Sequence, residues 1–312
     1  MTLPTRKSPI LRIGTRKSEL AQWQAKKVAE QLRQHGCKTE LVLISSQGDQ
    51  DQTTPLSEMG GKGVFTKALD DALLEGSVDM AVHSFKDLPT RQSLPLHVAA
   101  VLEREDPRDA LVAPHGTDFL EDDNDSAIIA TGSTRRRAQW LAKFPGHRIV
   151  NLRGNVNTRL QKVETNEWNG AIFAAAGLKR INLHHHITQY LDWMIPAPAQ
   201  GAMAVMVHQK DRRTQQLLEP LNHSATEQCT RVERELLHVL EAGCSAPVGA
   251  YATLDDDNNE LFLKAVALSH DGSKKFEVYS REPLENSKEM GTRAAYELLN
   301  NGAAEIIDQI RS

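Results

Sequence analysis

The chain has 312 residues, a formal net charge of −4 at pH 7, 40% hydrophobic residues and 25% charged residues. This is an ordinary globular composition, and the length predicts two or three domains. The chain has no apolar run of membrane-spanning length, its first residues lack the apolar core of a signal peptide, and its three scattered cysteines match neither a disulfide framework nor a metal-ligand spacing. We therefore expect a reduced, cytoplasmic protein without a membrane partner or a metal.

A strand–helix–strand pattern opens the chain. Residues 10–13 predict a strand, Ser18 is placed to cap a helix that ends near Gly36, and residues 41–44 predict a second strand. This unit is typical of a parallel sheet. Residues 15–18 then lie where the first strand meets the helix, at the edge where open α/β sheets bind ligands.

The segment 60–63 (GGKG) precedes another helical pattern. A phosphate-binding P-loop would need Ser or Thr directly after Lys62. Gly63 occupies that position, which excludes the nucleotide interpretation. We favour a flexible lid that carries the Lys62 ammonium; a plain turn before the helix is the alternative.

A buried strand over residues 78–82 leads into His83 and ends at Pro89, which leaves Lys86 and Asp87 at its carboxyl end. A lone Asp in a turn is usually solvated or a cap. An Asp at the exit of a central strand, beside a lysine, is a better candidate for acid–base work.

Two links, residues 103–109 and 196–201, bracket a second α/β run. Within it we expect strands at 127–130, 149–152 and 171–176, and helices from about Thr134 and about Asn155. The second link leads into a strand at 202–207. A chain that passes to a second lobe and returns through two hinges is typical of two-lobed ligand-binding proteins.

Residues 130–163 contain eight Lys or Arg and no Asp or Glu. Several cations fall at strand-to-helix turns, where backbone amides and the helix dipole also attract anions. The polar and basic residues at this predicted edge are Ser133, Arg135, Arg136, Arg153, Arg159, Lys179 and Arg180. We expect a ligand with several carboxylates or phosphates. Nucleic acid is a weak alternative because aromatic residues are not interleaved with the charges.

The last part of the chain predicts a small α+β domain. A capping box at residues 224–227 starts a helix that runs to about Leu240, and three strand patterns and a final helical region follow. Cys244 falls in a turn between these patterns; from the loop alone, an inert thiol is the safer interpretation. Cys229 is expected to pack inside the helix. The histidines at 184–186 indicate a polar helix surface more than a metal site.

These motifs together resemble the hydroxymethylbilane synthase (porphobilinogen deaminase) family over nearly the whole chain. The matching stretches are LRIGTRKS (11–18), GGKG (60–63), HSFKDLP (83–89), EREDPRD (103–109), NLRGNVNTR (151–159), AGLKR (176–180) and the Cys244 loop with Glu233 and Arg234 before it.

The resemblance implies an α/β fold of two doubly wound lobes, like those of periplasmic binding proteins, and a small C-terminal α+β domain with a three-stranded antiparallel sheet. The domains would cover residues 1–104 with 201–219, residues 105–200, and residues 220–312. It also implies a monomeric transferase of heme biosynthesis that condenses four porphobilinogen molecules on a covalent dipyrromethane primer, releases ammonia at each step, and frees the linear tetrapyrrole with water.

By resemblance, Cys244 holds the dipyrromethane through a thioether beside Gly243, Asp87 is the acid–base group next to Lys86, and Lys62 lies on the lid. Asp49 would lie near the loop after the second strand. The residues that would contact the cofactor or substrate carboxylates are Lys86, Arg16, Ser18, Ser133, Arg135, Arg136, Arg153, Arg159, Arg180 and Gln200.

The chain departs from the family pattern at four places, none of which removes a residue assigned to the chemistry. Ala242 replaces a common glycine, Gly132 a common hydroxyl residue, Glu58 an often basic residue, and Pro198-Ala199 a usual Val-Gly. The alternative function is a two-lobed binding protein for a polyanionic small molecule, in which Cys244 would be incidental.

Overall fold

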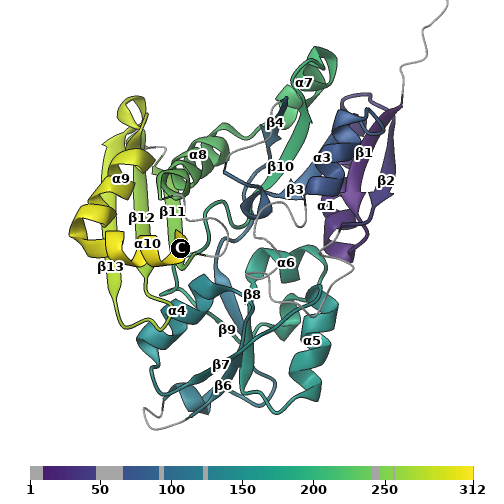
Figure 1. Ribbon diagram of the computed structural model, residues 1–312. Helices are drawn as coiled ribbons and strands as arrows, with labels where there is room; N and C mark the ends of the chain where they lie inside the picture. Colours follow the sequence, from purple (N-terminus) through teal and green to yellow (C-terminus); the bar gives the residue numbers. More distant parts are fainter. Residues whose placement is uncertain are drawn as a thin grey trace, which may run out of the picture.

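The computed structural model describes residues 10–46, 66–90, 95–121, 126–240, 246–255 and 257–311, apart from the side chains of 309–311. Two five-stranded sheets with flanking helices form two α/β lobes, and a three-stranded antiparallel sheet forms a third unit (Figure 1). This arrangement confirms the predicted fold class. The exact domain boundaries stay a prediction.

The first lobe contains a mixed sheet with the strand order β2-β1-β3-β10-β4. Its strands are β1 (Leu11–Arg16), β2 (Thr39–Ile44), β3 (Met80–Ser84), β4 (Leu96–Val101) and β10 (Met203–His208). The predicted opening unit is confirmed, because β1 pairs in parallel with β2 and with β3. β10 enters between β3 and β4 and runs antiparallel to both.

Helices cover both faces of this sheet. They are α1 (Glu19–Gln34), α3 (Lys67–Leu74), α7 (Arg212–Leu218) and the 3-10 turn η4 (Glu219–Leu221). Side chains of β10 alternate between the faces: Val205 packs in the cluster that contains Val28 of α1, and Ala204 in the cluster that contains Leu69 of α3. As predicted, α1 begins after Ser18, whose Oγ accepts a hydrogen bond from the Ala21 amide at 3.4 Å.

The second lobe repeats this design with the strand order β7-β6-β8-β5-β9. Its strands are β5 (Asp109–Val112), β6 (Ile128–Ala130), β7 (Arg148–Val150), β8 (Gly170–Ala174) and β9 (Gln189–Tyr190). Its helices are α4 (Thr134–Lys143), α5 (Val156–Thr165), α6 (Ala175–Arg180) and the 3-10 turns η2 (Asp118–Leu120) and η3 (His184–His186). Trp140 of α4 packs on one face of the sheet, and Leu160 of α5 with Leu178 of α6 on the other.

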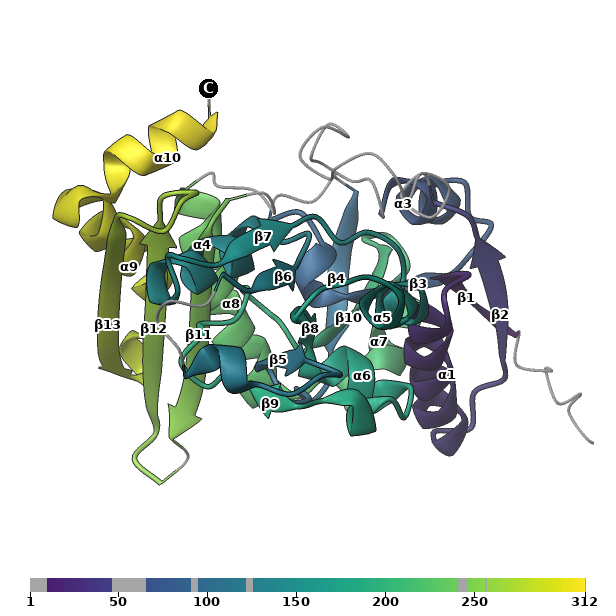
Figure 2. The same cartoon turned by 90° about the horizontal axis from the view of Figure 1, so that it is seen from below.

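The third unit packs two helices against its sheet. Its elements are α8 (Ser224–Val239), β11 (Val248–Asp255), β12 (Glu260–Leu268), β13 (Lys275–Pro283), the 3-10 turn η5 (Leu284–Asn286), α9 (Met290–Leu298), the π-turn η6 (Leu299–Ala303) and α10 (Ala304–Arg311). Val232 and Leu236 of α8 share one core with Leu263 of β12 and Ala294 of α9. β13 and β2 lie at opposite ends of the molecule (Figure 1, Figure 2).

One sequence prediction about this unit is wrong. We expected Ser224 to cap α8, but the cap is His223, whose imidazole Nδ1 accepts from the Thr226 amide at 3.2 Å. The expected helix itself is confirmed. Ser, Thr, Asp and Asn are the usual caps, so the pattern alone favoured the serine.

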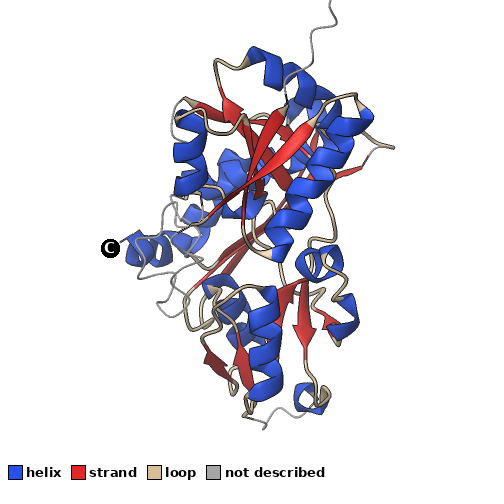
Figure 3. Cartoon of the chain, turned by 90° about the vertical axis from the view of Figure 1, so that its right-hand side faces the viewer, coloured by secondary structure: helices blue, strands red, loops and turns tan. Residues whose placement is uncertain are grey.

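The chain crosses between the lobes twice, before β5 and before β10, and Figure 3 shows the two lobe sheets one above the other. The crossings touch: the Glu105 amide donates to the Gly201 carbonyl oxygen at 3.1 Å. A Cβ on Gly201 would lie 2.3 Å from the Glu105 carbonyl oxygen, and the Gly201 φ is +89°. Only glycine allows the crossings to approach this closely.

Ala199 lies on the same crossing with a φ of 62°, which is costly for a residue with a Cβ. Its amide donates to Glu233 Oε2 at 2.6 Å, and its side chain is fully buried. This hydrogen bond holds the left-handed backbone at the position where the resemblance leads one to expect glycine.

The third unit is tied to the crossings by a buried ion pair. Arg104 Nη1 lies 2.6 Å from Glu233 Oε1, and the Glu233 side chain is 0% exposed. Glu233 also accepts from the Ala252 amide at 2.7 Å, while Arg104 Nε donates to the Gln200 carbonyl oxygen at 2.8 Å. A single carboxylate of α8 therefore joins both crossings to β11.

Candidate active site

Lys86 and Asp87 lie on a short 3-10 turn, η1 (Phe85–Asp87), directly after the buried strand β3. The Phe85 amide donates to the Ala202 carbonyl oxygen at 3.0 Å, which fastens the start of this turn to the chain entering β10. Asp87 is therefore held at the carboxyl end of a central strand, as the sequence indicated.

A pocket opens beside Asp87 in the first lobe. Its lining includes two predicted ligand contacts, Arg16 at the end of β1 and Ser18 before α1. It also includes His83 and Ser84 at the end of β3. Gln24 of α1 donates to Ser84 Oγ at 2.8 Å and so fixes one wall of the pocket.

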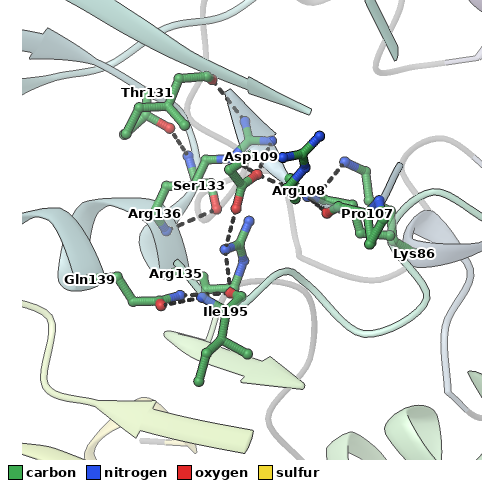
Figure 4. A network of polar contacts seen from close by, with 12 residues as sticks. Lys86, Pro107, Arg108, Asp109, Thr131, Ser133, Arg135, Arg136, Gln139 and Ile195 are labelled. Carbon is green, nitrogen blue, oxygen red and sulfur yellow. Dashed lines mark hydrogen bonds and ion pairs between the residues drawn. The ribbon is translucent and has the colours of Figure 1, made fainter. Parts of the chain in front are cut away.

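Arg135 and Arg136 occupy the first turn of α4 and are 4% and 6% exposed. The helix begins there because Ser133 Oγ accepts from the Arg136 amide at 3.4 Å. Arg135 Nη1 lies 2.7 Å from Asp109 Oδ2, and Arg136 Nε donates to Asp109 Oδ1 at 2.9 Å (Figure 4). Asp109 thus separates and orients the two guanidinium groups.

Gln200 joins this cluster to the first lobe. Its amide Nε2 donates to Asp109 Oδ1 at 2.9 Å, and its Oε1 accepts from Lys86 Nζ at 3.1 Å. Burial, together with the charges of Arg136 and Arg135, lowers the pKa of Lys86 to about 8, although Asp87 and Asp109 oppose the change. The positive charges of Lys86 in the first lobe and Arg136 in the second lobe therefore interact with each other.

Arg159 of α5 belongs to the same electrostatic cluster. Burial, with smaller effects of the Arg136 and Arg153 charges, lowers its pKa to about 10, and Asp87 opposes the change. Arg153 follows β7 and is 5% exposed. The charge of Asp87 in the first lobe therefore acts on cations of the second lobe.

Arg180 contacts the second crossing. Its Nη2 donates to the Gly201 carbonyl oxygen at 2.6 Å, and burial lowers its pKa to about 10. The cluster consists of Arg16, Lys86, Asp87, Asp109, Arg135, Arg136, Arg153, Arg159 and Gln200, and Arg180 borders it.

Gly132, one of the departures from the family pattern, has a steric reason in this chain. A Cβ at this position would lie 2.6 Å from the Leu152 carbonyl oxygen. The Thr131 hydroxyl remains, and its Oγ1 accepts from the Ser133 amide at 3.2 Å.

Several predicted site residues lie outside the described residues. They are Cys244, Gly243, Ala242, Lys62, Glu58 and Asp49. Their assigned roles stay predictions. Cys229, which the sequence placed inside a helix, is 6% exposed within α8.

Three buried polar residues near the site were not assigned a role from the sequence. The sequence pattern placed Asp109 in a charged hinge, yet Asp109 opens β5 and is 0% exposed. Glu233 and His83 were named only as parts of stretches that match the family. The apolar residues 110–113 that follow Asp109 were the available indication that it begins a buried strand.

The described residues suit an anionic ligand. Burial and, to a smaller extent, neighbouring cations lower the pKa values of Lys86 and Arg159, so a bound anion would stabilise their charged forms. The buried Nε of Arg135 has no hydrogen-bond partner among the described residues. The acetates and propionates of the dipyrromethane that the resemblance implies would provide carboxylates for these donors, so the donor set fits that cofactor.

Two further findings concern other ligands. The part of the chain that the structure describes contains no cluster of three or more His, Cys, Asp or Glu able to hold a metal. No helix among the described residues has both the length and the apolar character needed to cross a bilayer.

Two α/β lobes that meet at a buried cationic cluster define a two-lobed protein for small anionic ligands. Residues 11–216 match the family model described as "Porphobilinogen deaminase, dipyromethane cofactor binding domain", and residues 227–300 match "Porphobilinogen deaminase, C-terminal domain". The chain belongs to the porphobilinogen deaminase family. Its activity is that of hydroxymethylbilane synthase, a transferase of tetrapyrrole and heme biosynthesis with a dipyrromethane cofactor.

Family membership confirms the predicted enzyme class and cofactor and replaces the binding-protein alternative. Porphobilinogen as the substrate is consistent with the family.

Some solved structures of binding proteins are also similar. The methionine-binding protein MetQ has a TM-score of 0.45 at 11% identity, over 72% of this chain and 94% of that chain. A periplasmic substrate-binding protein of an ABC transporter from Coxiella burnetii has a TM-score of 0.42 at 17% identity, over 70% and 94%. The periplasmic VFT2 domain of Bordetella pertussis BvgS has a TM-score of 0.41 at 14% identity, over 68% and 86%.

Proposed function

We propose that Asp87 is the proton-transferring and charge-stabilising group of the condensation, and that Cys244 is the attachment site of the dipyrromethane. The observation that supports this assignment is electrostatic. Lys86 of the first lobe and Arg136 and Arg159 of the second all interact with one another's charges or with that of Asp87. A carboxylate such as Asp87 within a group of cations suits a reaction between anionic substrates that passes through a positive centre.

Each condensation exchanges one bond for another. The aminomethyl carbon–nitrogen bond of porphobilinogen breaks, and the nitrogen leaves as ammonia. The electron-poor methylene carbon then bonds to a pyrrole α-carbon, which releases its proton. Asp87 stabilises the positive charge, holds the pyrrole N–H groups, and accepts or returns the proton. When bound, the dipyrromethane supplies the pyrrole carbon that receives the first unit.

The remaining polar residues would position carboxylates. Each porphobilinogen carries an acetate and a propionate, so the site needs many donors of fixed geometry. We assign this task to Arg16, Ser18, Lys86, Ser133, Arg135, Arg136, Arg153, Arg159, Arg180 and Gln200, with Lys62 on the lid. Gln200 is 0% exposed, so any contact between Gln200 and a carboxylate requires a shift of its neighbours.

We further propose a cytoplasmic monomer whose domains follow the predicted boundaries. The free thiols of Cys37 and Cys229 support a reducing compartment. The sheet membership of β10 supports the return of residues 201–219 to the first lobe.

The test is the intact mass of the denatured protein beside a Cys244→Ala variant, with Cys229→Ala as the matched cysteine control. We expect extra mass equal to two porphobilinogen units less their ammonia in the wild type and in Cys229→Ala, and bare polypeptide in Cys244→Ala. If the wild type has bare mass, it is incubated with porphobilinogen and measured again. A wild type that still gains no mass, or a Cys244→Ala variant that does, overturns the attachment site.

A further inference from the structure

Asp109 is a charged residue at the centre of the site that has no exposed surface. It is 0% exposed, and its Oδ1 and Oδ2 accept from Arg136 Nε at 2.9 Å and Arg135 Nη1 at 2.7 Å. Gln200 Nε2 donates to the same Oδ1 at 2.9 Å. Figure 4 shows the carboxylate between the two guanidinium groups of α4. Since Asp109 has no exposed surface, it acts on the reaction through these neighbours.

The charge of Asp109 is retained despite burial. Burial alone would raise the pKa of this carboxyl, but the charges of Arg135 and Arg136 outweigh burial and lower the pKa. A buried ion pair of this kind adds little net stability compared with well-packed apolar residues. Its donors instead define one geometry for the two guanidinium groups.

The amide of Gln200 transmits this geometry to the first lobe. Its Nε2 donates to the Pro107 carbonyl oxygen at 2.7 Å and to Asp109 Oδ1 at 2.9 Å. Both acceptors require the NH₂ group, so the single amide oxygen is left facing Lys86 Nζ at 3.1 Å. Removing the Asp109 acceptor would free the amide to turn away from Lys86.

We propose that Asp109 is a positioning residue for the condensation: it sets the guanidinium groups of Arg135 and Arg136 and, through Gln200, the ammonium of Lys86 in one fixed arrangement. Carboxylates of the ligand then meet cations of both lobes at a constant separation. This inference rests on the roles proposed above for Lys86, Arg135 and Arg136. A purely structural ion pair is the competing explanation.

The alkaline limb of the pH profile of kcat/KM, together with the value of kcat/KM at the pH optimum, separates the two explanations. The charged groups that face Lys86 are Arg135 and Arg136 of α4, Asp109 of β5 and Asp87 of η1. Asp109→Asn removes an anion and leaves both guanidinium groups, so the limb near pH 8 is expected to move to lower pH. Gln200→Glu places a carboxylate beside Lys86 Nζ, so the limb is expected to move to higher pH by about one unit or more.

The control is Asp106→Asn on the same crossing. Asp106 pairs with Arg108 and Lys179 at 2.8 Å each and does not contact the Asp109 network in the described residues. It should leave the limb in place. All variants are measured as cofactor-loaded enzyme, with loading checked by intact mass, and Gln200→Glu alone carries the test if Asp109→Asn does not fold.

Opposite shifts of the limb in Asp109→Asn and Gln200→Glu, with a fall of about tenfold or more in the kcat/KM of Asp109→Asn at its pH optimum, support the positioning role. Shifted limbs with an unchanged optimum reflect the charges alone and overturn it. An unmoved limb in any loaded variant of this pair, with only the melting temperature lowered, overturns it in favour of the structural ion pair. Lys86→Arg distinguishes a failure of the underlying assignment. If the limb near pH 8 persists in that variant, Lys86 is not the titrating cation, and both its proposed role and the route through Gln200 are wrong.

Discussion

Asp87 is the residue on which the proposed chemistry depends, so its replacement tests that chemistry directly. We expect Asp87→Asn to fold normally and to lower the rate of product formation by about a hundredfold to ten-thousandfold, the usual contribution of a positioned acid–base group. The amide keeps the shape but cannot carry the proton or the negative charge. The measurement is kcat, together with the melting temperature.

Asp71→Asn is the matched control, since Asp71 is an exposed carboxylate of the same lobe. It should retain full activity. Near-normal turnover of Asp87→Asn would contradict the role of Asp87.

His83 makes a prediction about acid stability. Burial, with a smaller effect of Arg16, lowers its pKa from 6.5 to about 3. Below about pH 6.5 the unfolded chain therefore binds a proton that the folded protein does not, so the free energy of unfolding falls as the pH falls. This group alone should remove about 2 kcal/mol between about pH 7 and about pH 5.

The measurement is urea denaturation at both pH values. His83→Gln should flatten the dependence on pH, because the unfolded variant has no imidazole to protonate at this position. His115→Gln, which changes an exposed histidine, should leave the dependence as in the wild type. Equal slopes in wild type and His83→Gln would show that other groups control the acid sensitivity.

At the scale of elements, α8 of the third unit holds the turn that carries Asp87. Arg234 Nη1 donates to the carbonyl oxygens of Phe85 at 3.2 Å and Leu88 at 3.0 Å, and Nη2 donates to that of Pro89 at 2.7 Å. The guanidinium carbon also lies 4.3 Å from the centroid of the Phe85 ring. The same helix precedes Cys244 in the sequence, so one helix holds the turn that carries Asp87 and leads to the proposed attachment site.

We expect Arg234→Ala to lower kcat by about tenfold to a hundredfold, because a small displacement of a reacting group has a large effect on rate. The control is Arg231→Ala, one turn earlier on α8, whose guanidinium donates to Ser287 instead. Steady-state kinetics and melting temperatures are compared for both variants. An unchanged kcat in Arg234→Ala, with a loss of thermal stability only, would contradict the positioning of η1 by α8.

At the scale of the whole molecule, Glu233 connects the third unit to both crossings. Its two oxygens accept from Arg104, from the Ala199 amide and from the Ala252 amide. Glu233→Gln leaves the buried Arg104 without its counter-charge, and we expect the free energy of unfolding to fall by about 3–5 kcal/mol. Denaturation in urea measures this change.

The comparison is Glu305→Gln, which breaks the exposed pair with Lys274, and its stability should not change measurably. Added salt should also leave the contribution of Glu233 nearly unchanged, because a buried pair is poorly screened. A Glu233→Gln variant as stable as the wild type would mean that packing alone joins the third unit to the crossings.

Local patterns in the sequence predicted most elements of the fold. Ser18, Ser133 and Asn155 were placed at helix starts, and each side chain accepts from an amide three residues later. The exception is α8, where His223 took the place of Ser224. A cap depends on a few neighbours along the chain, so such predictions succeed without knowledge of the tertiary structure.

Contacts between residues far apart in the sequence could not be predicted from local patterns. Asp109 meets Arg135, Arg136 and Gln200 at sequence separations of 26, 27 and 91 residues. Nothing in the local pattern distinguishes such a carboxylate from a solvated one in a charged link. The same holds for Glu233, whose position in an amphipathic helix gave no sign of an arginine 129 residues earlier.

The sequence by itself determined the element order, the two crossings, the concentration of cations in the second lobe, and, through its motifs, the family. These properties depend on periodicity, turn residues and residue type, which are carried by neighbouring positions. The tertiary structure decided which cations meet, which of them share a counter-charge, and that Asp109, Gln200 and Glu233 are buried. Burial and charge pairing depend on the packing of three separate units, because the free energy of a charge is set by everything that surrounds it in space.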